Sequence, residues 1–120
     1  MIGRLRSFMY AFAGIATMVK SQRNAWIHAL ATATVIGAGA VFGITASEWC
    51  VLILAMMAVW CAEALNTALE FLADVASPDF HPLVKKAKDV AAGAVLIAAI
   101  GATVIGVIIF MPYINPKALV

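Results

Sequence analysis

The chain alternates between long apolar stretches and short polar ones, and three of the apolar stretches are long enough to cross a bilayer. Residues 25–44 carry no formal charge, and about twenty such residues are what a membrane-spanning helix needs. A second apolar run starts at Trp49, and its helical pattern continues past Glu63. A third runs from residue 90 to Met111, before Pro112. We therefore predict spans over residues 25–45, 48–76 (with a cytoplasmic extension) and 83–111.

The first twenty or so residues follow a helical pattern of a different kind. Apolar side chains recur at spacings of three and four, whereas polar residues fall largely on the other faces. The apolar positions are Leu5, Phe8, Phe12, Ile15 and Val19. Such a helix buries an aromatic stripe at the headgroup boundary and extends basic side chains to lipid phosphates. We predict an amphipathic surface helix over residues 4–22.

Short polar segments separate the predicted spans. Residues 43–47 are typical of a tight turn after the first span. The segment 77–79 contains Pro78, which disfavours helical geometry at the residue before it, and Pro82 can open the next helix at its first turn. The first span also holds Gly39 and Gly43 in the GxxxG spacing that can mark close helix contact.

Composition supports one small membrane domain over residues 1–120. Apolar residues make up 65% of the chain and charged residues only 12%, and a water-soluble domain of this length could not bury so much apolar surface. Most soluble enzymes and secreted scaffolds are therefore excluded, and a net charge of +2 is too small for a nucleic-acid binder. The predicted fold class is an all-α membrane protein with a surface helix and three transmembrane helices.

The basic residues are distributed unevenly around the predicted spans. Seven of the eight lysines and arginines lie before the first span or between the second and third, and only Lys117 follows the third. By the positive-inside rule, the surface helix and the loop between spans two and three lie in the cytoplasm.

Polar side chains form a stripe on the predicted second helix. Their spacing places them on one side of the helix, and three carboxylates there need a cation or a proton to meet them. The members of the stripe are Glu63, Asn66, Glu70 and Asp74. A complementary set opens the third span at the same expected depth, namely Lys85, Lys88 and Asp89.

This arrangement has several interpretations. It suits a solvated helix end, an interhelical salt bridge, a proton relay or a cation pathway. It also suits phosphoryl transfer, in which a divalent metal neutralises phosphate oxygens and a lysine contacts the transferred group. The sequence contains neither a GxxxxGK[ST] nor a GxGxxG motif, so a nucleotide would have to be held by helix side chains.

Two motifs at this separation are highly specific. The first is Glu63-Ala-Leu-Asn-Thr-Ala-Leu-Glu70, and the second is Ala87-Lys-Asp-Val-Ala-Ala-Gly-Ala-Val95, with Phe80-His81-Pro-Leu between them. Together they closely resemble the signature of the prokaryotic diacylglycerol kinase and undecaprenol kinase family. The resemblance covers nearly the whole chain, from the surface helix through the three spans.

The resemblance implies a homotrimer in the bacterial inner membrane, multi-pass, with ATP and Mg²⁺ at its cytoplasmic face and active sites shared between subunits. Glu63 matches the general base of the family, Asn66 its motif partner and Glu70 a metal ligand. Lys88 and Asp89 match the pair that contacts phosphate. The further positions that match the nucleotide lining are Tyr10, Asp79, Phe80 and His81.

One departure from the family pattern concerns the metal. Many members have Ser-Glu-Arg-Asn where this chain has Ser21-Gln22-Arg23-Asn24, and that glutamate is a second metal ligand in the family. Gln22 offers a neutral amide oxygen instead, so its expected contact with metal or nucleotide lacks one negative charge. Asn24 and His28, one helical turn apart, are candidates for contact with the substrate, and the other interpretation of this stretch is an interfacial Trp26 anchor beside a hydrogen-bonded histidine. The stretch 24–28 resembles the undecaprenol kinase branch more than the enterobacterial diacylglycerol kinase branch.

The leading hypothesis is an ATP-dependent kinase that phosphorylates the primary hydroxyl of a membrane lipid. The product would be phosphatidic acid from diacylglycerol or undecaprenyl phosphate from undecaprenol, and apolar spacing does not choose between the two. The alternative is a non-enzymatic oligomeric channel or proton-relay protein. It would use the stripe of Glu63, Glu70 and Asp74 and would need no nucleotide.

Overall fold

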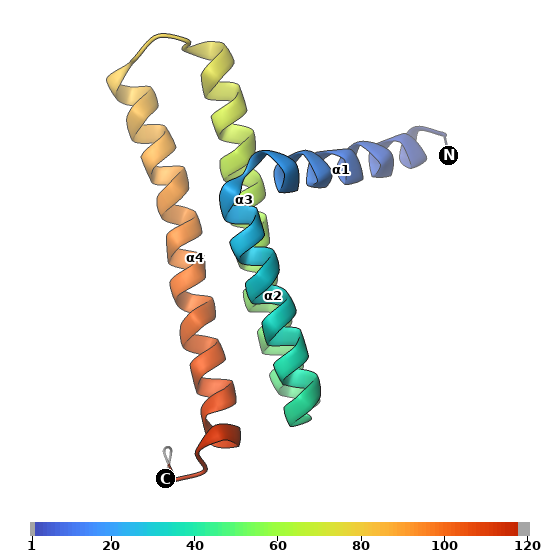
Figure 1. The fold of residues 1–120 in the computed structure, drawn as a ribbon. Coiled ribbons are helices and arrows are strands. Elements are labelled where there is room, and N and C mark those ends of the chain that lie inside the picture. The colour runs from blue at the N-terminus through green and yellow to red at the C-terminus, as the bar shows by residue number, and fades with distance from the viewer. Residues whose placement is uncertain (1, 118–120) are drawn as a thin grey trace.

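The computed structural model describes residues 2–117, which form four helices and no strand. The helices are α1 (Ile2–Ser21), α2 (Arg23–Phe42), α3 (Ala46–Ala76) and α4 (Pro82–Ile114). The last three are long and apolar enough to cross a membrane, which confirms the predicted all-α fold with three spans. Figure 1 shows these three running along one direction, while α1 projects sideways from them.

The bend between α1 and α2 is made at a single residue. Gln22 has an extended backbone (φ −109°, ψ 122°), and its N–H still donates to the carbonyl oxygen of Met18 at 3.1 Å. The aromatic stripe of α1 is exposed, with Phe8 at 65% and Phe12 at 69%. An exposed apolar stripe on a helix that crosses the direction of the spans is what a helix lying in the membrane surface requires.

The spans pack as an antiparallel α3–α4 hairpin with α2 against α3. The apolar core lies toward the turn at residues 43–45, where Ile44, Leu52 and Ile109 are buried together. Many other large apolar side chains of the spans are exposed, as expected where lipid covers them. The core therefore holds the spans together at the end opposite to the α3–α4 connection (residues 77–81).

The turn between α2 and α3 needs a glycine. Gly43 adopts a left-handed backbone (φ 62°) that ends α2. Thr45 then opens α3 with a capping box, because its hydroxyl accepts from the N–H of Glu48 and its own N–H donates to the Glu48 carboxylate. The two glycines of the GxxxG spacing thus have separate roles in this chain: Gly43 ends the helix, and Gly39 lies against Trp49.

Gly39 leaves no room for a side chain, since a Cβ there would lie 2.6 Å from the Trp49 indole. We expect Gly39→Ala to lower the free energy of unfolding by about 1–3 kcal/mol, because the indole or α2 must move. Thermal unfolding in detergent measures this change. Gly37→Ala is the matched control, because nothing lies within 4 Å of its Cβ position. Equal unfolding temperatures for the two variants would contradict the close packing of α2 on α3.

The end of α4 corrects one expectation, that the third span stops before Pro112. Pro112 lies inside α4, which continues to Ile114. Proline removes only one N–H donor, a small loss near a helix end. The last turn is held from outside, because the Tyr113 hydroxyl donates to Glu48 and its ring lies 5.9 Å from that of Phe42, centroid to centroid. The other helix ends differ from the predicted ones by a few residues.

Candidate functional site

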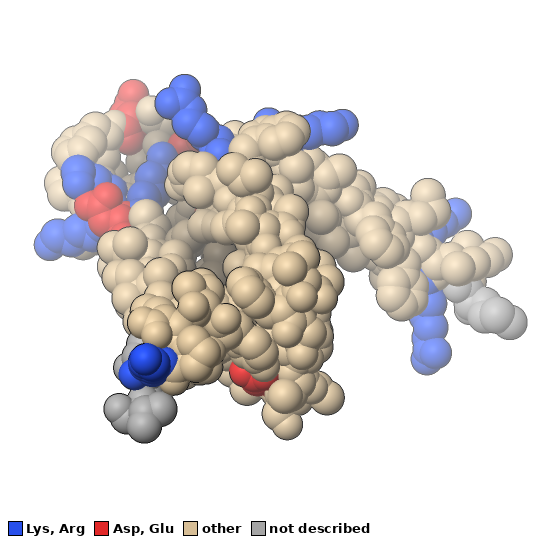
Figure 2. All heavy atoms as spheres, turned by 60° about the horizontal axis from the view of Figure 1, so that its bottom comes forward, with Lys and Arg blue, Asp and Glu red and all other residues tan. Residues whose placement is uncertain are grey.

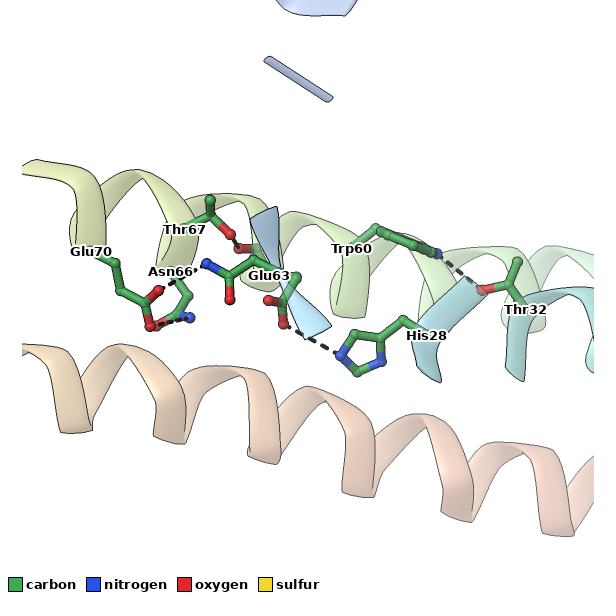
Figure 3. Close-up of polar contacts among 8 residues, drawn as sticks. His28, Thr32, Trp60, Glu63, Asn66, Thr67 and Glu70 are labelled. Carbon is green, nitrogen blue, oxygen red and sulfur yellow. Dashed lines mark hydrogen bonds and ion pairs between the residues drawn. The ribbon is translucent and has the colours of Figure 1, made fainter. Parts of the chain in front are cut away.

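The polar stripe predicted on the second span lies on α3 near the junction of α1 and α2. Figure 3 shows Glu63, Asn66 and Glu70 pointing from the same side of the helix. Glu63 is only 1% exposed and Asn66 7%, within a helix that is otherwise largely apolar. Buried polar groups of this kind need partners, and the carboxylates of the stripe face different elements.

Glu63 faces His28 of α2. The distance from His28 Nε2 to Glu63 Oε2 is 3.4 Å, which is an ion-pair distance and is drawn as a dashed line in Figure 3. The two groups do not meet the geometry of a hydrogen bond. Within residues 2–117, neither carboxylate oxygen of Glu63 has a hydrogen-bond partner. The Thr67 hydroxyl donates to the backbone carbonyl of Glu63 at 2.8 Å, so it leaves the carboxylate free. A buried carboxylate with two unpartnered oxygens needs a proton, a cation or a hydrogen-bond donor to meet it.

Glu70 is held by two amides. Gln22 Nε2 donates to Glu70 Oε2 at 2.8 Å, and Asn66 Nδ2 donates to Glu70 Oε1 at 3.3 Å. The side chain of Gln22 therefore comes from the bend between α1 and α2 and reaches the stripe on α3. The structure brings the two expected metal ligands, Glu70 and Gln22, into direct contact.

Asp74 is paired with α4 instead. Lys88 Nζ donates to Asp74 Oδ1 at 2.7 Å across the hairpin, whereas Lys85 and Asp89 pair along α4 itself at the same distance. The side chains of both pairs are partly or largely exposed, so each pair contributes less than about 1 kcal/mol. The interhelical salt bridge considered from the sequence therefore exists for Asp74 alone, among the residues described.

A cleft of about 570 Å³ lies at the connection between α3 and α4. It gathers Asp79, Phe80, His81 and Lys88, all expected to line the nucleotide. His81 has a structural role as well, because its Nδ1 accepts from the N–H of Leu83 and caps α4. Charged side chains from both helices therefore surround an opening large enough for phosphate groups.

Two of the expected site residues lie away from the others within one copy of the chain. Tyr10 is 73% exposed and lies on α1, which projects away from the α3–α4 hairpin (Figure 1). Asn24 is exposed in the first turn of α2, and no side-chain hydrogen bond is formed by it within the described part of the chain. Asp89 is directed to Lys85 rather than to its neighbour Lys88.

An apolar cavity of about 560 Å³ runs between α2, α3 and α4. Its lining includes His28 toward the polar stripe and continues to Ile114 at the far end of α4. Most of the residues between them are aliphatic, including Val35, Leu52 and Val107. The cavity therefore leads along the spans to the vicinity of the Glu63–His28 pair.

Trp60 and Thr32 were not predicted to support the site. Trp60 Nε1 donates to Thr32 Oγ1 at 3.0 Å, and the Trp60 ring meets His28 edge to face with centroids 6.1 Å apart. Figure 3 shows this support beside Glu63. In sequence, Trp60 belongs to an apolar run, and only the packing of α2 on α3 reveals its role. For His28, the signal in the sequence was its position one helical turn after Asn24.

Charged side chains are concentrated away from the body of the bundle. Figure 2 shows them gathered around one end of the bundle and along the projecting helix, while the rest of that face is almost entirely uncharged. The group at the end includes the pairs Asp74–Lys88 and Lys85–Asp89. The α3–α4 connection therefore carries one of the main groups of charged side chains of the chain.

The donor set suits Mg²⁺ shared with phosphate. Residues 2–117 contain no group of three or more His, Cys, Asp or Glu placed to hold a metal. Mg²⁺ commonly needs only one or two carboxylates, because water and substrate phosphates supply its other oxygens. Glu70 offers a carboxylate, and the Oδ1 of Asn66 is buried without a partner in the described structure. These hard oxygen donors fit Mg²⁺ bound together with a nucleotide.

The sequence matches the family model described as prokaryotic diacylglycerol kinase over residues 9–110. It is 37% identical over 107 residues to the undecaprenol kinase of Bacillus subtilis, which covers 89% of this chain and 87% of that protein. It is 42% identical over 109 residues to the diacylglycerol kinase of a Synechocystis species, which covers 90% of this chain and 62% of that protein.

These matches decide between the two classes of function left open by the polar stripe. A channel or proton relay explains neither the matches nor the cluster of charged side chains in the cleft at residues 77–81. The family model covers most of the chain, and both relatives bear the names of lipid kinases. The protein is therefore a lipid kinase, and it belongs to the prokaryotic diacylglycerol kinase family.

Proposed function

We propose that the protein transfers the γ-phosphoryl group of ATP to the primary hydroxyl of diacylglycerol or undecaprenol, with Glu63 as the general base. The observation that carries this proposal is the state of the Glu63 side chain. It is 1% exposed, and within the described residues both of its carboxylate oxygens lack hydrogen-bond partners. A positioned carboxylate of this kind accepts the hydroxyl proton as the lipid oxygen attacks phosphorus.

The apolar cavity supports this role of Glu63. It runs along the spans and ends beside His28, whose Nε2 is 3.4 Å from the Glu63 carboxylate. A lipid chain lying in the cavity would present its terminal hydroxyl near Glu63. Water would be excluded from the base, which favours transfer to the lipid over hydrolysis.

The nucleotide would be held by the cleft at the α3–α4 connection and by Glu70. Mg²⁺, when bound, neutralises phosphate oxygens and orients them. Glu70 would hold it, with the amide oxygens of Asn66 and Gln22 as the neighbouring donors. The pair Lys88–Asp74 is partly exposed and weak, so Lys88 can leave Asp74 for a phosphate at small cost. Phe80 is 78% exposed and offers a surface for the adenine ring.

Association of three copies would complete this site. Tyr10 is exposed on α1 and lies away from the cleft of its own chain. An α1 helix lying across the hairpin of a neighbouring copy would bring Tyr10 to that copy's nucleotide. The basic residues around α1 and at the start of α4 would face the cytoplasm, where ATP is available.

The function is tested by measuring ATP consumption with purified protein in mixed micelles that contain diacylglycerol, undecaprenol or neither. We expect lipid-dependent consumption of ATP and a phosphorylated lipid product with one of the two substrates. Equal rates with and without lipid would overturn the proposal. The lipid that gives the higher kcat/KM is the substrate.

Gln22 allows a test of the metal assignment. Gln22→Glu replaces the hydrogen bond to Glu70, 2.8 Å long, with two carboxylates that repel each other unless a cation lies between them. We therefore expect tighter apparent Mg²⁺ binding by about 1 kcal/mol or more. The Mg²⁺ dependence of thermal unfolding and of nucleotide binding measures it. An unchanged Mg²⁺ dependence with altered ATP affinity would mean that Gln22 contacts the nucleotide and not the metal.

A further inference from the structure

The carboxylate of Glu63 has one basic neighbour. Among residues 2–117, His28 is the only lysine, arginine or histidine with a nitrogen within 4.0 Å of a Glu63 oxygen. The other polar side chains nearby are already used. Asn66 donates to Glu70, and Thr67 donates to the backbone of Glu63. No other described side chain is in place to fix the direction of the Glu63 carboxylate.

His28 is itself held firmly. Its side chain is 14% exposed, and its Nε2 is fully buried with no hydrogen-bond partner in the described residues. The Trp60 ring packs against it edge to face, and Trp60 is fixed to α2 by its hydrogen bond to Thr32, one helical turn beyond His28. This support directs Nε2 toward Glu63 and away from the aliphatic part of the cavity.

We infer that His28 positions the general base: its Nε2–H donates a hydrogen bond to Oε2 of Glu63 and leaves Oε1 free for the lipid hydroxyl. This inference rests on the proposed role of Glu63. The present separation of 3.4 Å becomes an aligned hydrogen bond with a small rotation of either side chain, as catalytic hydrogen bonds often tighten only when substrate is bound. This hydrogen bond gives a partner to both buried atoms, Nε2 of His28 and Oε2 of Glu63.

The inference specifies the tautomer of His28. A neutral ring that donates from Nε2 keeps its lone pair on Nδ1, and the hydrogen bond selects this form. The chain contains only two histidines, so protein labelled with ¹⁵N-histidine gives two sets of ring signals. His28→Gln identifies the set from His28 by its loss. We expect the Nε2–H form, with a clear shift of the Nε2 signal in Glu63→Gln. An Nδ1–H form would overturn the inference without reference to activity.

Kinetics supply the second test. His28→Phe keeps a flat ring against Trp60 but removes the donor, and a misplaced base should lower kcat by about tenfold or more with an unchanged KM for ATP. His28→Gln keeps an N–H donor and should retain most of the activity. Thr34→Val is the control on α2, because the Thr34 hydroxyl is exposed and bonds only to the backbone of Leu30 among the described residues. It should behave as the parent protein.

A double variant separates a positioning role from a structural one. In the Glu63→Gln background, His28→Phe should cause no further loss, because the group that His28 positions is already inactive. A loss of the same factor in both backgrounds would overturn the inference, as would a His28→Phe variant with parental kcat. If Glu63→Gln alone keeps parental activity, the assignment of the base fails instead. The failure of the inference and that of the proposed function are thus distinguishable.

Discussion

Replacing Glu63 with glutamine is expected to lower lipid-dependent turnover by about 10² or more while ATP still binds. Glutamine keeps the size and shape of the side chain but cannot take the hydroxyl proton. The buried position makes the effect large, because Glu63 is 1% exposed and water has little access to replace it. Turnover with each accepted lipid and binding of a fluorescent ATP analogue, measured on the same preparation, separate chemistry from nucleotide binding.

The matched control is Glu48→Gln, the same substitution on the same helix at the opposite end of the span. Glu48 accepts from Tyr113 and from the N–H of Thr45, so its loss should affect stability more than turnover. Parental turnover in Glu63→Gln would remove Glu63 from the role of base. A loss of ATP binding equal to the loss of turnover would mean that Glu63 acts on the nucleotide.

Replacing Glu70 with alanine is expected to have the second largest effect. The variant should need at least about tenfold more Mg²⁺ for half-maximal activity, because Glu70 is the only carboxylate among residues 2–117 that bonds to the amides of Gln22 and Asn66. Its nucleotide affinity should fall as well, since the metal and the phosphates bind together. Titration of activity and of nucleotide binding with Mg²⁺ at fixed ATP measures both changes.

Asp74→Ala is the comparison for Glu70→Ala, one helical turn further along α3. Asp74 is 65% exposed and paired with Lys88 of α4, so its removal should change the Mg²⁺ requirement much less. It frees Lys88 for phosphate and should leave nucleotide binding close to that of the parent. Equal shifts of the Mg²⁺ titration in the two variants would mean that Asp74 shares the metal and that the site lies closer to the α3–α4 connection.

The helices could be predicted from the sequence because their signals are local. Length, the absence of charge and the positions of proline and glycine mark the spans. The end of α4 was missed because Tyr113 holds the last turn through Glu48, 65 residues away in the chain. A pairing of that kind follows from the packing of the hairpin and has no signature near Pro112.

The polar stripe on α3 was predicted from the sequence, whereas the partners of its carboxylates were predicted less well. Helical spacing places Glu63, Glu70 and Asp74 on one stripe, yet it does not say which neighbour meets each carboxylate. The lysines of α4 were the evident complement, and only Asp74 pairs with one of them. Glu63 instead faces His28 of α2, and Glu70 is held by Gln22, because α2 packs against α3 beside the stripe and the bend at Gln22 brings its side chain within reach.

The bend at Gln22 also links the depth of Glu70 in the membrane to the position of α1. One residue joins the helix suited to the membrane surface to the first span, and the side chain of that same residue holds Glu70. The depth of Glu70 in the membrane is therefore tied to the depth of α1. A bilayer that changes the depth of α1 should therefore shift Glu70 with it, so the position of Glu70 is set by the membrane surface and not by the centre of the bundle.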